Sequence, residues 1–285
     1  MPELPEVETI RRDLEKKIIN QKIVDVFVSS KAKVFPIKNI FIKKLKNNQI
    51  KRIDRIGKLL ILVLEKDEYL LIHLKMTGQL IYQCGEKIIG GGHSEKEIPQ
   101  TLPDKSTRIF LDFLGGGRLY FNDQRRFGYM KIVDKNILEK EKNKYGIEPL
   151  QNNFTLVNFQ KALQNRKTSI KAVLLNQKII AGVGNIYADE SCFAAGIKPS
   201  RKANTLSSFE IKKLYQALEK VIAKSIQERG TTFNHYRDSE GKKGNFVSFL
   251  KVYGRGGQEC KKCHKKLKKA KVVGRGTVFC ENCQK

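Results

Sequence analysis

The sequence predicts an α+β chain of several domains: an N-terminal helix, an antiparallel β-sandwich or barrel, a helical region and a C-terminal zinc ribbon. Three observations lead to this fold class. Short β-branched and apolar runs, separated by polar turns, fill residues 23–133, as in antiparallel sandwiches or barrels. An apolar period typical of helices replaces them after residue 135. Two Cys-x-x-Cys pairs follow near the C-terminus.

The composition favours a polyanionic partner. The 285 residues include 56 Lys and Arg against 29 Asp and Glu, which gives a net charge of +27 and a pI near 9.8. This charge exceeds what solubility alone requires, so nucleic acid is preferred over a merely soluble basic protein. The acidic N-terminus does not resemble a signal peptide, and no apolar run approaches 18 residues. We expect an intracellular protein without a membrane span.

Residues 4–18 are predicted to form an amphipathic helix because Val7, Ile10, Leu14 and Ile18 have the spacing of one apolar face. Pro5 lies where proline is favoured in a first helical turn.

Pro2 and Glu3, directly before this helix, are candidate catalytic residues. Removal of Met1 leaves Pro2 with a secondary α-amine. Its pKa near ~7.7–8.0 keeps part of it unprotonated at neutral pH, and amines form covalent Schiff bases with carbonyl-like carbons. Glu3 is a candidate general acid or base. The alternative is a helix start without catalytic function, since acidic residues also suit a helix N-terminus.

The strand region follows in order along the chain. The expected strands are residues 23–28, 59–64, 69–74, 79–82, 108–114, 118–122 and 128–133. Between residues 84 and 105 the periodicity is lost and three consecutive glycines occur, which predicts a surface loop.

Helices dominate from residue 135. The expected helices are residues 154–163, 169–175, 186–194 and 207–227. Residues 230–250 hold Gly230, Gly241 and Gly244 and few apolar side chains, which predicts a loop.

The cysteine pairs Cys260/Cys263 and Cys280/Cys283 have the spacing of a four-thiolate zinc ribbon. Such a site is closed and structural, because no coordination position remains for water or substrate. One structural Zn²⁺ is therefore expected. Disulfides or a chance arrangement are the alternatives.

Two glycine-bearing segments are candidate phosphate sites. Gly274-Arg275-Gly276 lies on the expected hairpin between the cysteine pairs, where the planar Arg275 fork suits phosphate; an ordinary turn with a solvated Arg275 is the alternative. Gly182-Val183-Gly184 precedes Asn185, a good N-cap at a helix start that suits anions. A helix corner without a ligand is the alternative there.

Three further residues, Arg125, Phe127 and Met76, are candidates for entering a duplex beside an extruded base. The alternative places Phe127 and Met76 in the core. Lys58 follows Gly57 in a basic stretch, and its alternative is a solvated surface lysine.

Together these motifs resemble the formamidopyrimidine-DNA glycosylase family of bacterial base-excision repair, over the whole chain. The motifs that carry the resemblance are Pro2–Thr9 (PELPEVET), Ile56–Leu59, His73–Gly78, Asn122–Gly128, Ala181–Glu190 (AGVGNIYADE), Val252–Gly254 and Gly274–Gln284. The resemblance implies a β-sandwich led by a helix (1–134), a helix–two-turns–helix domain (135–255) and a zinc finger (256–285).

The resemblance also implies a bifunctional glycosylase and AP lyase for oxidised purines such as 8-oxoguanine and formamidopyrimidines. Pro2 would attack C1′ with Glu3 as acid and base, and β,δ-elimination would follow. Lys58 would donate a proton and contact phosphate, and Glu190 would support catalysis. Residues 230–250 would cover the oxidised base.

Other residues are implied to contact DNA. Those expected to hold phosphates are Asn185, Arg275, Lys171 and His73, with Arg275 also assigned to the catalytic set. Those expected to wedge the vacated duplex are Met76, Arg125 and Phe127. The expected partner is damaged double-stranded DNA, and we expect a monomer in a bacterial-type cytoplasm, held at the nucleoid by DNA.

The chain departs from the family pattern at three places. Gln124 replaces the usual proline, residues 105–108 lack an expected histidine pair, and the loop 84–105 is longer than usual. Two other functions are considered. An endonuclease VIII-like glycosylase for oxidised pyrimidines is disfavoured because Leu4 and Val7 resemble the formamidopyrimidine branch. A non-catalytic zinc-ribbon damage sensor is disfavoured by the intact Pro2-Glu3 pair.

Overall fold

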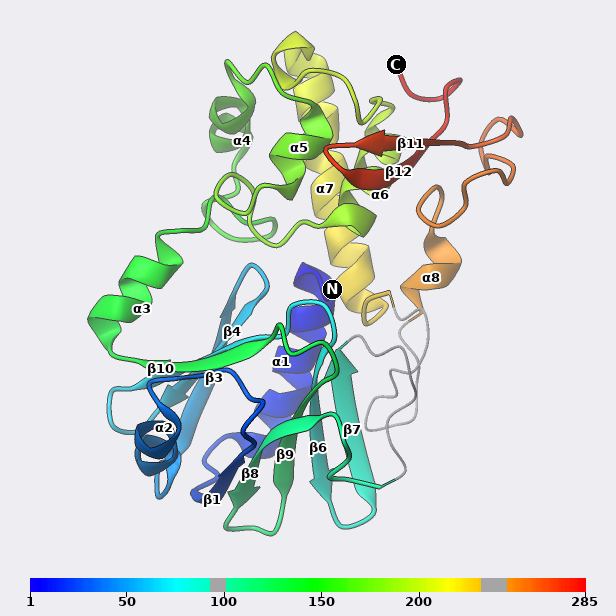
Figure 1. The fold of residues 1–285 in the computed structure, drawn as a ribbon. Coiled ribbons are helices and arrows are strands. Elements are labelled where there is room, and N and C mark those ends of the chain that lie inside the picture. Colours follow the sequence, from blue (N-terminus) through cyan, green and yellow to red (C-terminus); the bar gives the residue numbers. More distant parts are fainter. Residues whose placement is uncertain (93–100, 232–244) are drawn as a thin grey trace. The chain divides into compact units, whose positions relative to one another are not determined.

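The computed structural model describes residues 1–92, 101–231 and 245–285, which divide into two compact units (Figure 1). Unit 1 is Met1–Asn143 with the described part of 228–245, and unit 2 is Lys144–Gln227 with Phe246–Lys285. Among the described residues, no helix has both the length and the apolar character that a membrane span needs.

Unit 1 is a β-sandwich of two five-stranded sheets. The first has the order β1 (Ile23–Val28), β8 (Thr107–Phe113), β9 (Arg118–Asp123), β6 (Gly78–Cys84), β7 (Lys87–Gly92). The second has the order β2 (Val34–Phe35), β10 (Tyr129–Val133), β5 (Tyr69–His73), β4 (Leu59–Leu64), β3 (Ile50–Ile56). All neighbouring strands are antiparallel except β2 and β10. Alternate residues of β8, such as Ile109 and Leu111, point into the core.

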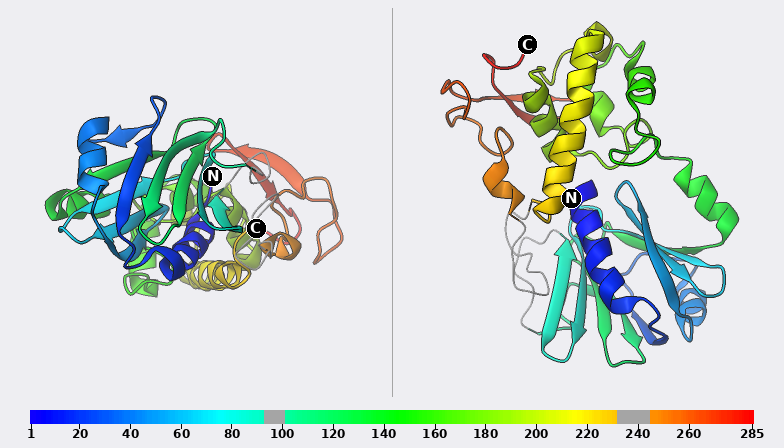
Figure 2. Two further views of the ribbon diagram at one scale, coloured as in Figure 1. Left: turned by 90° about the horizontal axis from the view of Figure 1, so that it is seen from below. Right: turned by 180° about the vertical axis from the view of Figure 1, so that it is seen from behind.

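Two helices cover the edge strands of the sandwich (Figures 1 and 2). Helix α1 (Leu4–Ile18) contacts β3 and β7, an edge strand of each sheet. Helix α2 (Lys38–Leu45) contacts β1 and β2, the two opposite edges. A helix that covers an edge strand shields its unpaired backbone groups from pairing with another chain. The predicted helix 4–18 and its buried apolar face are confirmed, whereas α2 was not predicted.

The predicted loop 84–105 is wrong over its first part, because β7 pairs with β6 there. Gly90 and Gly91 lie opposite Ile81 and Leu80 in this ladder. A Cβ on Gly92 would lie 2.4 Å from the carbonyl oxygen of Gly78, so glycine permits a close backbone approach rather than marking a turn. Residues 93–100 of the predicted loop lie outside the described residues.

The expected helices are confirmed to within about two residues. Unit 1 also contains α3 (Lys135–Lys142). The helices of unit 2 are α4 (Leu156–Leu163), α5 (Ile170–Leu175), α6 (Asn185–Ala195), η1 (Ala203–Thr205), α7 (Ser208–Gln227) and α8 (Phe246–Phe249). Helix α7 packs against α6 and buries Leu214, Leu218 and Ile222. The predicted loop 230–250 is wrong at α8, where Phe246 is buried, and its residues 232–244 lie outside the described part.

The C-terminal ribbon is a hairpin of β11 (Lys268–Val272) and β12 (Arg275–Phe279). Its two turn residues, Val273 and Gly274, both have positive φ, as type I′ hairpin turns require. The predicted hairpin between the cysteine pairs is thus confirmed. The ribbon belongs to the same compact unit as the helices, and the division into three domains stays a prediction.

Candidate functional site

The N-terminus of α1 is held by Glu6. Glu3 is the N-cap residue, and its backbone N–H donates to Oε2 of Glu6 at 2.9 Å. Oε1 of Glu6 accepts hydrogen bonds from the backbone N–H and the hydroxyl of Thr231 at 2.8 and 2.9 Å. Glu3 and Glu6 are 4% and 9% exposed. The helix therefore starts where the sequence predicted, and it fixes the backbone that carries Pro2 and Glu3.

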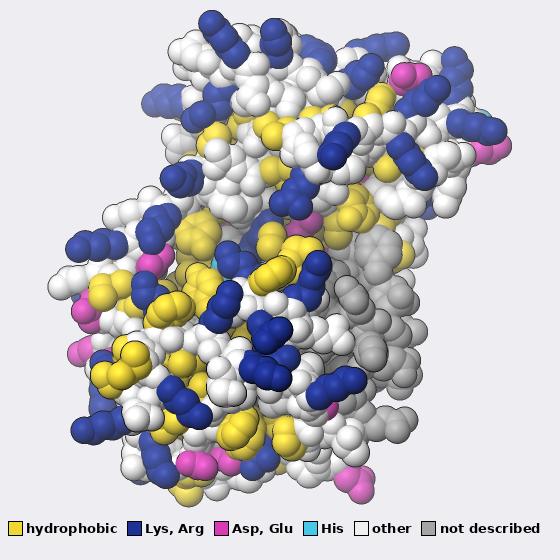
Figure 3. Space-filling model, in the orientation of Figure 1, with side chains coloured by type: hydrophobic (Ala, Val, Ile, Leu, Met, Phe, Trp, Pro, Cys, Tyr) yellow, Lys and Arg dark blue, Asp and Glu magenta, His cyan; other side chains and the backbone are white. Residues whose placement is uncertain are grey.

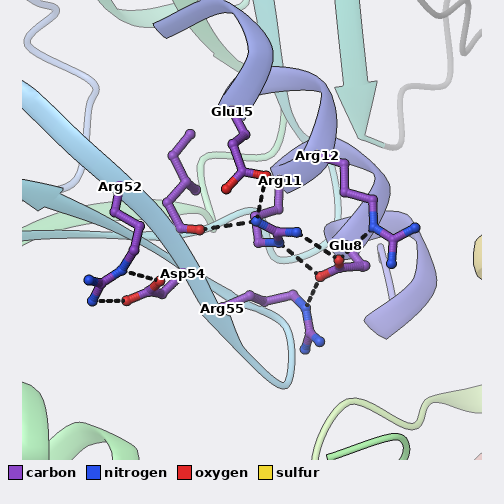
Figure 4. A network of polar contacts seen from close by, with 8 residues as sticks. Glu8, Arg11, Arg12, Glu15, Arg52, Asp54 and Arg55 are labelled. Carbon is purple, nitrogen blue, oxygen red and sulfur yellow. Dashed lines mark hydrogen bonds and ion pairs between the residues drawn. The ribbon is translucent and has the colours of Figure 1, made fainter. Parts of the chain in front are cut away.

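A cluster of three arginines around Glu8 joins α1 to β3 (Figure 4). Glu8 pairs with Arg11, Arg12 and Arg55 at 3.1, 2.8 and 3.1 Å. Burial raises the pKa of Glu8, but hydrogen bonds from Arg11 and Arg12 and the charge of Arg55 outweigh it and hold the pKa at about 2.

Lys58 lies in the turn between β3 and β4, next to this cluster. Arg55 donates from Nη1 to the carbonyl oxygen of Gly57 at 2.8 Å, and Gly57 has a φ of 56°. Lys58 itself is 4% exposed, so the alternative of a solvated surface lysine is wrong. The cluster of Glu8 therefore supports the turn that presents Lys58.

The candidate wedge residues are exposed. Met76 is 39% and Phe127 49% exposed, so the alternative that places them in the core is wrong. The guanidinium of Arg125 lies 5.6 Å from the ring centroid of Phe127, within cation–π range. Met76 lies between β5 and β6, and the Arg125–Phe127 loop lies between β9 and β10. Exposed apolar side chains on sheet connections are suited to enter a base stack.

His73 is a neutral imidazole. Its Nδ1 accepts a hydrogen bond from the backbone N–H of Lys75 at 3.1 Å, which assigns the proton to Nε2. Burial and the nearby charges of Lys75 and Lys58 lower the pKa of His73 to about 3. The side chain can therefore donate a hydrogen bond but carries no positive charge near neutral pH.

In unit 2, Asn185 is bonded to Gly276, the residue after Arg275, although the two are 91 residues apart in sequence. Nδ2 of Asn185 donates to the carbonyl oxygen of Gly276 at 3.1 Å. Arg275, the first residue of β12, is exposed. Gly184 rather than Asn185 is the N-cap of α6, so the predicted capping role of Asn185 is wrong. Its amide is bonded across to the ribbon instead.

The two turns between α5 and α6 depend on Gln177, which the sequence analysis did not identify. Its side-chain amide donates to the carbonyl oxygens of Leu175 and Val183 at 3.0 and 2.8 Å. Its Oε1 accepts from the N–H of Gly182 at 2.8 Å. An amide that satisfies three backbone groups fixes a turn, but a lone glutamine gives no signal in a sequence.

Lys171 is buried and engaged within unit 2. Its Nζ pairs with Asp189 at 2.6 Å and donates to the hydroxyl of Thr277 and the carbonyl of Gly276 at 2.8 and 3.1 Å. Lys171 and Asp189 are both 0% exposed. Burial raises the pKa of Asp189 to about 6, although the charge of Lys171 opposes it. In this structure Lys171 supports β12 and is not available to a phosphate.

Glu190 is a buried anchor for the segment that leads into the ribbon. Its carboxylate accepts hydrogen bonds from the backbone N–H groups of Lys251, Val252 and Tyr253 at 2.8–3.1 Å. Burial raises the pKa of Glu190, against these hydrogen bonds. Its contacts hold the Val252–Gly254 motif.

The four C-terminal cysteines fit a metal. Their Sγ atoms all lie within 4.8 Å of one another, with Cys260 to Cys283 at 3.9 Å and Cys263 to Cys280 at 3.4 Å. Zinc–sulfur bonds of about 2.3 Å in a tetrahedron place sulfur atoms about 3.8 Å apart. The predicted cluster is confirmed as a group suited to bind a metal ion.

Comparison with known proteins identifies the family. Residues 1–130 match the model of the formamidopyrimidine-DNA glycosylase N-terminal domain, and residues 145–236 match its H2TH domain. The chain belongs to the formamidopyrimidine-DNA glycosylase family. Relatives with that name from Desulfitobacterium hafniense and Heliobacterium modesticaldum are 38% and 39% identical, and the alignments cover all of each chain.

Solved formamidopyrimidine-DNA glycosylase structures have the same fold. The Lactococcus lactis Fpg complex with an N7-benzyl-Fapy-dG containing DNA has a TM-score of 0.87 and 33% identity over all of both chains. The Thermus thermophilus MutM (Fpg) protein has a TM-score of 0.84 and 35% identity over 99% of this chain and 98% of that one. The predicted family and fold class are confirmed.

The site residues expected from the formamidopyrimidine-DNA glycosylase family divide between the two units. Unit 1 holds Pro2, Glu3, Lys58, His73, Met76, Arg125 and Phe127. Unit 2 holds Lys171, Asn185, Glu190, Arg275 and the four cysteines. In Figure 3, Lys and Arg side chains occur on the surfaces of both units and outnumber the acidic side chains.

Proposed function

We propose that this chain is a bifunctional DNA glycosylase and AP lyase of base-excision repair, which removes oxidised purines through its N-terminal proline. Family membership over the full length supports the glycosylase activity. The observation that carries the catalytic assignment is the buried Glu6 carboxylate, which fixes Glu3 and the adjoining Pro2 at the start of α1.

Covalent catalysis begins at the nitrogen of Pro2 after removal of Met1. The nitrogen attacks C1′ of the damaged nucleotide, an N–C1′ bond forms, and the glycosidic bond breaks. Its electron pair leaves with the base, which takes up a proton. The Pro2 nitrogen then loses its proton, the C1′–O4′ bond breaks as O4′ takes up a proton, and a charged iminium remains, which acts as an electron sink. Loss of a C2′ proton then breaks the C3′–O bond, and a second elimination breaks the C5′–O bond.

The other groups have supporting roles. Glu3 transfers protons at the sugar, and Lys58 donates a proton and contacts phosphate. Neutral His73 donates a hydrogen bond to a phosphate oxygen through Nε2. Asn185 and Arg275 hold the phosphates beside the extruded nucleotide.

Met76, Arg125 and Phe127 fill the space that the nucleotide leaves. Base extrusion costs a few kcal/mol, which wedge insertion and phosphate contacts offset. The resemblance assigns residues 230–250 to the oxidised base; most of this segment lies outside the described residues.

Zinc has a structural role in this proposal. One Zn²⁺ held by Cys260, Cys263, Cys280 and Cys283 would stabilise a module whose small core includes Val252 and Leu267. It would thereby support the hairpin that carries Arg275. Metal analysis of the purified protein should give one equivalent of zinc per chain, and active protein without zinc would refute the assignment.

The partner is damaged double-stranded DNA, and binding should weaken with salt because the chain carries a charge of +27. The Lactococcus lactis structures are complexes with Fapy-dG containing or abasic-site DNA, which supports this partner. We further propose a monomer that resides in a bacterial-type cytoplasm and associates with the nucleoid through DNA.

Borohydride trapping on an 8-oxoguanine duplex, followed by peptide mass analysis, tests the mechanism because reduction converts the imine into a stable cross-link. A cross-link at Pro2 supports the mechanism and the loss of Met1. A cross-link at Lys58 would keep the lyase but change the nucleophile. Binding without any cross-link would favour a non-catalytic sensor. Preferential cleavage of thymine glycol would favour the endonuclease VIII-like alternative.

A further inference from the structure

Two connections that carry Met76 and Phe127 cross side by side from one sheet of the sandwich to the other. Residues 74–77 join β5 to β6, and residues 124–128 join β9 to β10. Strands β6 and β9 are neighbours in one sheet, with Gly78 opposite Asp123. Strands β5 and β10 are neighbours in the other, with His73 opposite Tyr129. Each connection therefore begins and ends beside the other.

The carboxylate of Asp123 binds both connections. Its Oδ1 accepts a hydrogen bond from the hydroxyl of Thr77, next to Met76. Its Oδ2 accepts from the backbone N–H of Gly128, next to Phe127, at 2.7 Å. The oxygen of Thr77 also accepts from the backbone N–H of Arg125 at 3.0 Å. We call these bonds the Thr77–Asp123 clasp.

The clasp is buried and restricts the movement of both connections. Asp123 is 1% and Thr77 6% exposed, so breaking a bond would leave a buried polar group without its partner. The backbone around it is tightly packed. A Cβ on Gly78 would lie 2.4 Å from the carbonyl oxygen of Leu74, and one on Gly128 would lie 2.7 Å from the ring of Phe121.

We propose that Thr77 and Asp123 are positioning residues that hold Met76 and the Arg125–Phe127 loop at a fixed spacing, so that both enter the duplex as one rigid wedge. The inference rests on the proposed function of these side chains. Rigid loops lose less conformational entropy on insertion than mobile ones. The clasp also supplies the rigidity that a proline ring would give at position 124, where this chain has Gln124.

Thr77→Val tests the clasp because it keeps the side-chain shape and removes the hydroxyl. Thr77→Ser keeps the hydroxyl. Thr107→Val is the control, because residue Thr107 is also 6% exposed but its hydroxyl bonds to Asn122 and Asp104 and not to the carboxylate of Asp123. A 2-aminopurine beside an 8-oxoguanine reports unstacking during wedge insertion in a stopped-flow experiment. A single-stranded abasic oligonucleotide reports the lyase step without a duplex to wedge.

The clasp predicts that Thr77→Val slows the 2-aminopurine signal about tenfold or more, because the change removes both hydrogen bonds of the Thr77 hydroxyl. Thr77→Ser and Thr107→Val should retain the wild-type rate, and all variants should cut the single-stranded abasic substrate equally. An unchanged fluorescence rate in Thr77→Val would overturn the clasp. Equal losses on both substrates would also overturn it, because the change would then act on chemistry or folding. A wild-type protein that cuts neither substrate would instead refute the proposed function, while the fluorescence comparison would still decide the clasp.

Discussion

Glu6 and Thr231 are joined by two hydrogen bonds to a single oxygen, Oε1 of the carboxylate. The other oxygen, Oε2, accepts the backbone N–H of Glu3. Gly230, before Thr231, has a φ of 82°, and a Cβ there would lie 2.9 Å from Oε1. One buried acid therefore fixes the start of α1 and the residue that precedes segment 232–244.

Glu6→Gln should slow formation of the Pro2 cross-link in single-turnover trapping by about 10- to 100-fold. An amide has only one acceptor oxygen, so its NH₂ group must face one of the present donors, and a lost bond to a charged group costs about 1.5–3 kcal/mol. Glu15→Gln is the matched control, because it removes a carboxylate from the same helix that pairs with Arg11 and not with Glu3 or Thr231. Equal trapping rates in the two variants would contradict the prediction.

Glu8 should stabilise the fold by an amount that decreases as the pH becomes acidic. Its pKa is about 2 in the folded protein against an ordinary value of 4.5, so the unfolded chain takes up the proton first as the pH falls. The contribution is therefore complete above about pH 4.5 and is lost between there and pH 2. We expect on the order of 2 kcal/mol, discounted for the exposed part of the cluster.

Thermal unfolding of Glu8→Gln measures this contribution. Relative to wild type, the Tm should be lowered at pH 7, and the difference should shrink by more than half toward pH 2.5. Glu139→Gln removes an equal charge from an exposed pair on α3 and serves as control. A Tm difference that does not change with pH would show that packing, and not charge, accounts for the role of Glu8.

Local pattern was sufficient to predict most of the fold. The spacing of Val7 and Leu14 identified α1, and the Cys260–Cys283 spacing identified the metal cluster, because both signals lie within short segments. The sequence does not predict strand β7, because its glycines normally weaken strands. In β7 the absence of a Cβ allows Gly92 to approach the backbone of Gly78, a contact that depends on the tertiary structure.

Residue roles that depend on partners distant in sequence could not be predicted. Nothing near Lys171 in the sequence indicates that Asp189 and Thr277 surround its ammonium. Asn185 similarly has a capping pattern but bonds to Gly276, 91 residues away. The sequence predicts candidate site residues, and only the tertiary structure distinguishes an exposed charge from a buried support.

Arg275 and His73 should differ in how they affect the salt dependence of DNA binding. Arg275→Ala removes an exposed cation and should reduce the slope of log K against log salt by about 0.9. His73→Ala should weaken binding about tenfold with an unchanged slope, because the imidazole is neutral and donates one hydrogen bond. Fluorescence anisotropy between about 50 and 200 mM salt measures both quantities. A slope change in His73→Ala would show that DNA binding protonates the ring.

Lys171→Met should destabilise unit 2 by about 3–5 kcal/mol, because it leaves the buried Asp189 carboxylate without its cation. Lys171→Met combined with Asp189→Leu should recover part of this loss, since removing both charges also removes the cost of burying them. Recovery remains partial because the N–H of Val278 loses its acceptor on Asp189. Urea unfolding, followed by the loss of the helical signal, measures the free energy of unfolding.

The same variants test whether Lys171 supports β12 or contacts a phosphate of the DNA. Lys171 is 0% exposed, so in the folded Lys171→Met protein any loss of affinity or of salt slope should arise from displacement of β12 and Arg275 and should accompany the loss of stability. The double variant should regain affinity together with stability. A slope reduced by about 0.9 with unaltered stability would mean that Lys171 leaves Asp189 and binds a phosphate when DNA is present.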